Sequence, residues 1–203
     1  NSKLFFTLLF LKFLILLSFS SSYSSELFYP FLTSFSLENI NPWQSYYEQG
    51  LLDAFPYHGF MLFLLAPFAI LGDVIGGFEF FLKIPLLIAD LGILFILFKI
   101  YPNKEKKIYI FYFLNPIIIY AIYMHSQLDI IPTALFFAAI YFLTLQRIKI
   151  SALFFGLALA TKFHVVIAIP LVIFYLYKKF PIVEGFKYIF IILLILLIFD
   201  LPF

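Results

Sequence analysis

Apolar residues fill most of this chain in long stretches, which are separated by short groups of charged and turn-forming residues. A helix needs about 20 apolar residues to cross the roughly 30 Å hydrocarbon core of a bilayer. Stretches that fit one span each are residues 4–19, 82–98, 108–124, 128–145 and 188–203. The pattern therefore predicts an all-α, polytopic transmembrane protein.

Two further stretches do not fit one upright span. Residues 59–72 are short and contain Pro67, so we expect a partial or re-entrant segment there, with a full traverse as the alternative. Residues 150–177 are too long, and Thr161 to His164 interrupt them, so we expect a broken pair of helices over 150–161 and 163–177. Together these elements predict a single transmembrane module over 1–203. Because the chain begins at Asn1 and stops directly after an apolar run, we expect it to be the N-terminal part of a longer protein, truncated at the C-terminus.

The composition supports a membrane protein. Hydrophobic residues make up 65% of the 203 residues, charged residues make up 12%, and the mean hydropathy is +1.09. A soluble domain is about 45–50% apolar and about 25% charged, so a soluble enzyme is excluded. With no cysteine, a disulfide framework, a thiolate nucleophile and a Cys-ligated metal are excluded as well. No basic cluster indicates nucleic-acid binding, and we expect membrane lipids as partners.

The basic residues predict the orientation, because Lys and Arg are enriched in cytoplasmic loops. The long segment 20–58 contains four acidic residues and no Lys or Arg, which indicates a first extracytoplasmic loop. Its Trp43, Tyr46 and Tyr47 are typical of the headgroup level, so we expect one or two short interfacial helices around 41–52. Ten of the 13 basic residues then lie in the cytoplasm: Lys3, Lys99, Lys104, Lys106, Lys107, Arg147, Lys149, Lys178, Lys179 and Lys187. We expect a multi-pass protein of a prokaryotic plasma membrane, or of the endoplasmic reticulum if the source is eukaryotic.

Polar residues at bilayer depth are functional candidates, because a charge there needs a cavity or a partner. His125 and Asp129 are four residues apart and would share a helical face if the following helix begins early. In that case they could meet a phosphate or a sugar hydroxyl. The alternative is that Asp129 caps the helix 130–145 and that His125 lies among the headgroups.

Lys162 and His164 form a second candidate site at the interruption in 150–177. A cation at a turn inside the membrane suits an anionic lipid headgroup such as a phosphodiester. The alternative is a snorkelling lysine that caps the carbonyls of the broken helix. Among other charged residues in the apolar stretches, Asp90 is expected to make a buried hydrogen bond between helices. Lys12 is expected to pair with Asp90 or to snorkel, and Lys83 to meet a lipid phosphate.

Several motifs occur in an order that resembles the membrane glycosyltransferases of the GT-C superfamily. The resemblance is closest to the glycosylphosphatidylinositol mannosyltransferase, the dolichol-pathway glucosyltransferases and their prokaryotic relatives. Residues 55–61 (FPYHGFM) are similar to a Tyr-Pro-Pro-Leu-like stretch of this family, whose second Pro is absent here. The other motifs are Asn115-Pro116, the run 125–132 (HSQLDIIP) with Ser126 at a usual Gly, the run 151–158 (SALFFGLA), Lys162 and Pro170.

The resemblance implies a transferase that moves a hexose, for example mannose, from a polyprenyl-phosphate donor to a lipid-linked or cell-envelope glycan acceptor on the extracytoplasmic face. The family places its catalytic carboxylate in the first outer loop, where Glu38 is the first candidate for the general base and Asp53 the second. Because this loop has no Asp-x-Asp, no metal site and no cofactor are expected.

The chemistry assigns roles to the remaining candidates. Sugar transfer needs a base for the acceptor hydroxyl and positive charge on the departing phosphate. We expect Lys162 and His125 to face the phosphate, Gln127 and Asp129 to orient hydroxyls or the loop, and an apolar groove to hold the prenyl chain. The alternatives are a transporter or flippase of lipid-linked sugars, and a structural subunit of a membrane complex.

Overall fold

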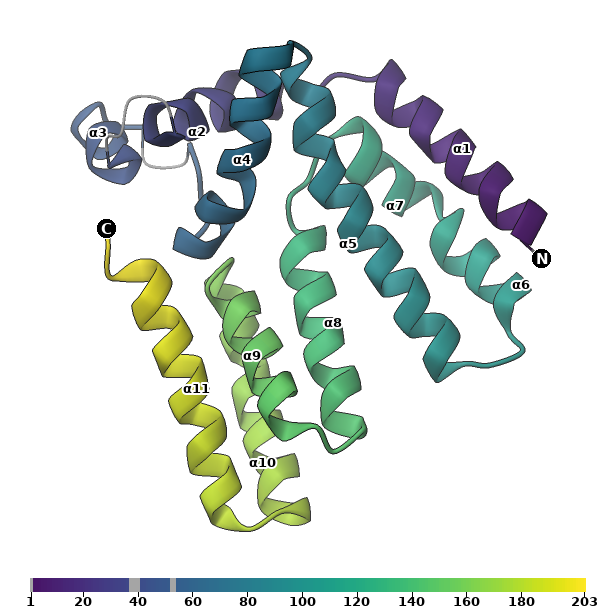
Figure 1. The fold of residues 1–203 in the computed structure, drawn as a ribbon, viewed down its shortest axis with the longest axis vertical. Helices are drawn as coiled ribbons and strands as arrows, with labels where there is room; N and C mark the ends of the chain where they lie inside the picture. The colour runs from purple at the N-terminus through teal and green to yellow at the C-terminus, as the bar shows by residue number, and fades with distance from the viewer. Residues whose placement is uncertain (1, 37–40, 52–53) are drawn as a thin grey trace. The chain divides into compact units, whose positions relative to one another are not determined.

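The computed structural model describes residues 2–36, 41–51 and 54–203, which form helices and contain no strand (Figure 1). This confirms the predicted all-α class. In chain order the elements are α1 (Ser2–Ser18), η1 (Tyr23–Phe28), α2 (Tyr29–Ser36), α3 (Pro42–Glu48), α4 (Gly59–Ile75), α5 (Phe78–Ile100), α6 (Glu105–Ile108), η2 (Tyr109–Phe113), α7 (Pro116–Ile119), η3 (Tyr120–Met124), α8 (Ile130–Thr144), α9 (Ile148–Leu159), η4 (Phe163–Ala168), α10 (Ile169–Lys179) and α11 (Ile182–Asp200). Segments η1, η2 and η3 are π-helical, and η4 is a 3₁₀ helix.

Helices long and apolar enough to cross a bilayer make this a membrane protein. In the described part of the chain, α5 and α11 each meet that requirement alone. Two bent pairs meet it if each is one broken span: residues 3–18 with 23–36, bent by 64°, and residues 105–113 with 116–124, bent by 51°. Helices α4, α8 and α9 are apolar but shorter.

The chain divides into two compact units. Unit 1 comprises residues 1–55 and 65–130, and unit 2 comprises residues 56–64 and 131–203, so the division falls within α4. The single transmembrane module expected over 1–203 stays a prediction.

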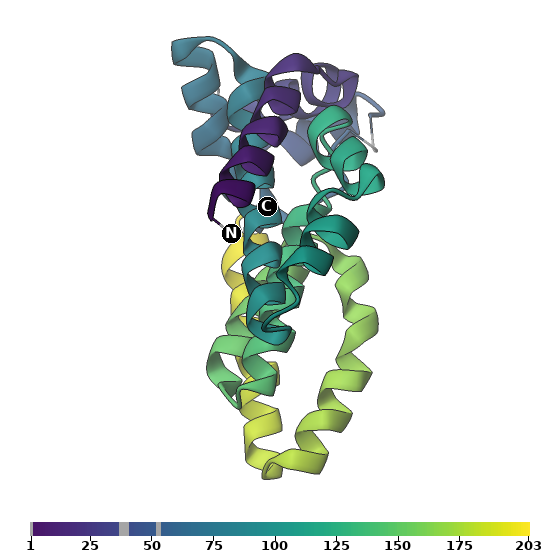
Figure 2. The same ribbon diagram turned by 90° about the vertical axis from the view of Figure 1, so that its right-hand side faces the viewer.

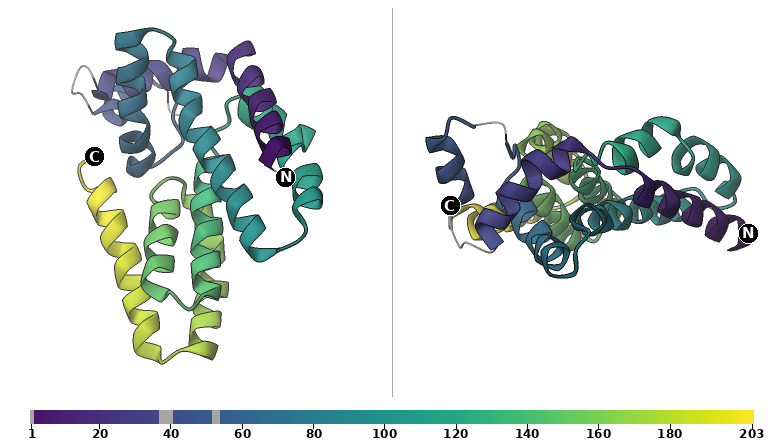
Figure 3. Two further views of the ribbon diagram at one scale, coloured as in Figure 1. Left: turned by 45° about the vertical axis from the view of Figure 1, so that its right-hand side comes forward. Right: turned by 90° about the horizontal axis from the view of Figure 1, so that it is seen from above.

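In unit 1, α1, α5 and the segment from α6 to η3 lie side by side (Figures 1 and 3). The second bend has a local cause at Asn115 and Pro116. Asn115 Oδ1 accepts a hydrogen bond from Ile117 N at 2.9 Å, and Pro116 occupies the first turn of α7, so a new helix begins there. A buried apolar cluster of Leu8, Leu94, Ile108, Tyr109 and Phe113 joins α1 to α5 and η2.

Segment 20–58 contains more helix than the sequence analysis expected. Helix α3 lies within the expected range, with Asn41 as its N-cap and Pro42 in its first turn. Segments η1 and α2 were not expected. They bury Phe28, Phe31 and Leu32, whose spacing of three and four residues is that of one helical face.

In unit 2, α9 and α11 pack along each other, and α11 follows α10 after a short connection at Phe180 and Pro181 (Figure 2). Helix α9 ends at Leu159 and η4 begins at Phe163, on either side of Lys162. The buried core of this unit is made by Ala139, Leu143, Ala152, Phe155, Ala158, Leu159, Val165, Val172, Leu176, Tyr188 and Ile192.

Candidate functional site

Three chain segments of unit 2 meet where α4 begins. His58 N donates to Thr161 O and Phe60 N donates to Ala160 O, both at 3.0 Å, which ties the start of α4 to the turn after α9. Between them, a Cβ added to Gly59 would lie 2.0 Å from Phe199 O, near the end of α11. Only glycine permits so close an approach of backbone, so the residues that follow α9 and those that end α11 lie beside the same turn.

Asp200, at the end of α11, contacts two groups of this turn. Its Oδ1 accepts a hydrogen bond from Gly59 N at 3.0 Å, and its Oδ2 lies 3.5 Å from His58 Nδ1. The first N–H groups of a helix have no partner inside the helix, so the carboxylate satisfies one of them. The side chains of His58 and Asp200 are 40% and 35% exposed, so both are accessible to a ligand.

Lys162 lies in the turn after α9 that contacts the start of α4. Its backbone is extended and its side chain is half-buried, with Nζ 4.9 Å from the centre of the Tyr57 ring. Tyr57 is itself buried, so it gives the ammonium a fixed cation–π partner. We call Tyr57, His58, Lys162 and Asp200 the unit 2 cluster. Its residues come from the start of α4, the turn after α9 and the end of α11, and they include an ammonium group and an imidazole paired with a carboxylate.

The unit 2 cluster has the groups needed to handle a phosphate ester. An ammonium carries three hydrogen-bond donors and full positive charge, which suits phosphate oxygens. An imidazole can give or take a proton, and a carboxylate near Nδ1 orients its ring. His164, the predicted neighbour of Lys162 in this role, is exposed. Sequence reasoning placed neither His58 nor Asp200 in a site, although His58 stands in the stretch that resembles the family and Asp200 is an acid at the end of an apolar run.

The other predicted binding residues are in unit 1, in the turn that links η3 to α8. His125 lies against the rings of Tyr23 and Tyr120, with ring centres 4.9 and 5.7 Å away, and its carbonyl accepts from Ser21 Oγ at 2.9 Å. Ser126 is buried with a φ of 57°, a conformation that favours glycine. The turn is therefore held in one conformation by η1 and η3.

The expected common face of His125 and Asp129 is not formed. Segment η3 ends at Met124 and helix α8 begins at Ile130, so His125 directly follows η3, Asp129 directly precedes α8, and the two residues do not lie on one helix. The intervening Gln127 is half-buried, and its backbone N–H donates to Ala121 O at 2.8 Å. The five predicted binding residues thus belong to separate units: His125, Gln127 and Asp129 to unit 1, and Lys162 and His164 to unit 2. The predicted catalytic residues Glu38 and Asp53 lie outside the described residues.

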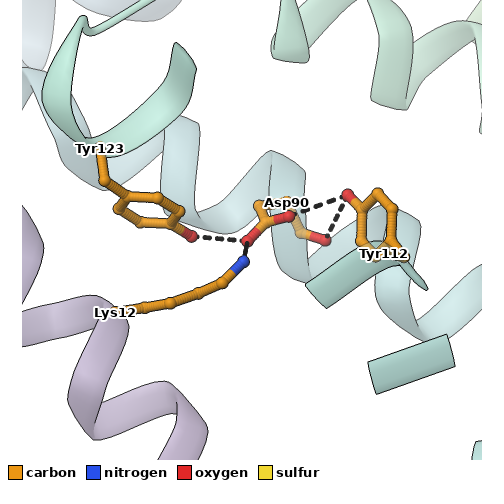
Figure 4. A network of polar contacts seen from close by, with 4 residues as sticks. All are labelled: Lys12, Asp90, Tyr112 and Tyr123. Carbon is orange, nitrogen blue, oxygen red and sulfur yellow. Dashed lines mark hydrogen bonds and ion pairs between the residues drawn. The ribbon is translucent and has the colours of Figure 1, made fainter. Parts of the chain in front are cut away.

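A charged network lies inside unit 1 (Figure 4). Lys12 Nζ on α1 donates to Asp90 Oδ2 on α5 at 2.6 Å, and the two side chains are 1% and 0% exposed. Tyr123 OH donates to Asp90 Oδ2 at 2.5 Å, Tyr112 OH donates to Asp90 Oδ1 at 2.8 Å, and Lys12 Nζ lies 3.7 Å from the centre of the Phe113 ring. The expected pairing of Lys12 with Asp90 is confirmed. Both charges have protein partners from three segments, so we assign this network to holding the segments together.

Lys83 differs from its prediction. The expectation was a lysine at the membrane boundary that meets a lipid phosphate, but the side chain is only 1% exposed. Its Nζ donates to Leu16 O at 3.3 Å and also to Phe19 O. The carbonyls at the end of α1 have no partner inside the helix and carry partial negative charge, so they attract the ammonium inward.

Comparisons with known proteins were made with the whole chain. No family model, curated protein or solved structure matched it. Within residues 2–36, 41–51 and 54–203, no three His, Asp or Glu side chains are grouped so that they could hold a metal ion. The chemistry of the unit 2 cluster is therefore the basis for a function.

Proposed function

We propose that this chain is part of a membrane glycosyltransferase of the GT-C kind. It transfers a hexose, for example mannose, from a polyprenyl-phosphate-linked donor to a lipid-linked or cell-envelope glycan on the extracytoplasmic face. The observation that carries the proposal is Lys162 held over Tyr57 beside the His58–Asp200 pair. The order of the motifs that resemble the family supports it independently.

The donor has an apolar chain and a charged headgroup, and unit 2 offers a surface for each. An exposed apolar surface on α11 has about 610 Å³ of open space beside it and reaches Asp200. Leu193, Leu197 and Leu201 are among the residues that line it, each more than half exposed. We propose that a prenyl chain lies along this surface and brings its phosphate to the end of α11, where Asp200 belongs to the unit 2 cluster.

The transfer step explains why a cation is needed. As the acceptor oxygen bonds to the anomeric carbon, the bond from that carbon to the phosphate oxygen breaks, and the phosphate gains a second negative charge. Lys162 stabilises that charge, and His58 can donate a hydrogen bond to the same phosphate. The acceptor hydroxyl gives its proton to a carboxylate, for which Glu38 and Asp53 stay the candidates from the sequence.

Replacing Lys162 in the full-length protein tests the proposal. We expect Lys162→Ala to lower hexose transfer from a labelled polyprenyl-phosphate donor by roughly 10²–10³-fold, as the loss of one charge-stabilising donor commonly does. Lys162→Arg should keep part of the activity, since it keeps the charge and changes the geometry.

The matched control is Lys178→Ala, which removes an exposed lysine whose Nζ lies 5.6 Å from the centre of the Phe174 ring. It should transfer hexose at the parental rate. An unchanged rate in Lys162→Ala would refute the phosphate role. Movement of the donor across the bilayer without any transfer would instead support the flippase alternative.

A further inference from the structure

The part of segment 20–58 that belongs to unit 1 contains an aromatic pocket. A cavity of about 210 Å³ is lined by Phe31, Trp43, Tyr46, Tyr47, Leu51 and Phe55, and we call it the aromatic pocket. Phe31 and Phe55 are buried and stack with ring centres 4.7 Å apart. The rings of Trp43 and Tyr46 meet Phe31 edge-on, at 5.3 and 5.0 Å. The interior of the pocket is therefore a set of rings that hold one another in place.

The mouth of the pocket is open to solvent. Tyr47 is 72% exposed and Leu51 is 52% exposed, whereas Phe31 is 1% exposed. Pockets that hold drug-sized ligands have volumes of roughly 300–1,000 Å³. A volume of about 210 Å³ is smaller, and it suits one six-membered ring with its substituents.

The chemistry of the lining favours a neutral sugar. The C–H groups on one face of a pyranose are apolar and lie well against an aromatic ring, and Tyr O–H and Trp N–H groups are hydrogen-bonding partners of the kind that sugar hydroxyls use. A phosphate is disfavoured, because segment 20–58 contains no Lys or Arg. A quaternary ammonium group also binds in aromatic cages, but among the described residues no carboxylate lines this pocket, and the Glu48 carboxylate on α3 accepts from Gln44 Nε2 at 3.2 Å.

We propose that the aromatic pocket binds one pyranose ring of a neutral glycan. If the chain is a glycosyltransferase, that ring belongs to the acceptor, and this last step rests on the proposed function. A pyranose held in this segment would present its hydroxyls on the side of the membrane where the transfer is expected.

The chain supplies its own reporter for this site. Trp43 is its only tryptophan, so a ligand in the aromatic pocket changes the intrinsic tryptophan fluorescence directly. The protein, with any tryptophan outside residues 1–203 replaced by phenylalanine, is placed in nanodiscs of phosphatidylglycerol, which contains neither sugar nor choline. It is then titrated with methyl α-mannopyranoside and methyl β-glucopyranoside, and separately with glycerol and with choline chloride. We expect a saturable change in the millimolar range with at least one glycoside and none with glycerol or choline.

Variants locate the response. Tyr47→Ala should weaken glycoside binding roughly two- to tenfold, the range expected for one aromatic contact, and it leaves the buried rings in place because Tyr47 is exposed. The matched control is Tyr177→Ala on α10, which removes a tyrosine of similar exposure, 69% against 72%. Phe55→Ala, which opens the interior of the pocket, should abolish the response.

The outcomes separate this site from the proposed function. A response to choline alone would overturn the sugar assignment in favour of a cation site, and no saturable response to either glycoside would overturn it entirely. The binding assay contains no donor lipid, so it is independent of transfer. A protein that binds the glycoside but transfers no hexose would support the sugar site and refute only the proposed transferase activity. A protein that transfers hexose but shows no fluorescence response would support the transferase activity and refute the sugar site.

Discussion

Three lysines lie within the apolar stretches, and each has a different partner. Lys12 meets a carboxylate, Lys83 meets the carbonyls that end α1, and Lys162 meets the face of Tyr57. Lys12 and Lys83 are each 1% exposed, whereas Lys162 is half-buried. Of the three, Lys162 is the one positioned for a ligand, because part of its side chain reaches the surface while the other two ammonium groups are enclosed by protein.

The pair of Lys12 and Asp90 leads to a prediction about stability. Removing one charge of a buried pair commonly costs about 3–5 kcal/mol, because the other charge is left without compensation. We expect Asp90→Asn to destabilise the protein by that order, and Lys12→Met together with Asp90→Asn to destabilise it less. Thermal unfolding of the single and double variants in one detergent measures both.

The double variant of Lys12→Met and Asp90→Asn is the control for the single variants Lys12→Met and Asp90→Asn. The double variant lacks both charges, and the amide introduced at position 90 still has an oxygen that can accept from Tyr112 or Tyr123. If the losses of the two single variants simply add in the double variant, Lys12 and Asp90 do not stabilise each other.

At this scale, the sequence predicted contacts between opposite charges and missed contacts with the backbone. Lys12 and Asp90 are opposite charges in separate spans, and their pairing follows from the cost of burying either alone. The partners of Lys83 are carbonyl groups, which every residue has, so no residue type marks them. Asp200 also contacts a backbone N–H, that of Gly59, across a separation of 141 residues.

Among the elements, close packing of α9 against α11 depends on Gly156. A Cβ on Gly156 would lie 2.7 Å from Ile195 Cδ1 and 3.3 Å from Ile192 Cα, so the helices approach through a residue without a side chain. Small residues at a spacing of four are typical of such interfaces in membranes. Ala152, Gly156 and Ala160 have that spacing, and all three lie on or next to α9.

Alanine substitutions at two glycines should therefore change the stability of unit 2 in different directions. Gly156→Ala should destabilise unit 2 by about 1–3 kcal/mol, since overpacking forces the helices apart. Gly185→Ala, in α11 with nothing within 4 Å of its added Cβ, should be neutral or stabilise by up to about 1 kcal/mol through helix propensity. Unfolding in a detergent series measures both, and equal shifts would contradict the close approach at Gly156.

The break at Asn115 shows what the apolar pattern omits. Residues 108–124 are apolar enough to be predicted as one span, but the structure bends by 51° between 113 and 116. Hydropathy predicts how much of a segment is buried away from water, but it does not predict the direction of the helix axis. The direction is set by an N-cap side chain and a proline, and these were interpreted as part of a family-like motif.

For the whole molecule, composition and the lengths of the apolar stretches are sufficient to predict an all-α membrane protein, because helices satisfy every backbone group in lipid. The division of the elements into two units was not predicted, since it depends on which helices touch. The orientation in the membrane follows from the distribution of Lys and Arg and stays a prediction.

Cysteine labelling tests that orientation cleanly, because the chain has no cysteine of its own. Gln49→Cys lies in segment 20–58, which is predicted to be extracytoplasmic, and Pro102→Cys lies between α5 and α6; both positions are exposed. In intact cells an impermeant thiol reagent should label Gln49→Cys and leave Pro102→Cys unlabelled until the membrane is opened. Neither substitution removes a charge. Labelling of Pro102→Cys alone would reverse the orientation.

The contact between Gly59 and Asp200 also sets an order of events during synthesis. The two residues are 141 positions apart. At roughly 5–20 residues per second, the ribosome adds Asp200 about 7–28 s after Gly59. Throughout that interval the first amide of α4 has no carboxylate, and His58 has no acidic neighbour from α11. The unit 2 cluster is thus completed only when the end of α11 has been made, so a nascent chain cannot acquire it before that point.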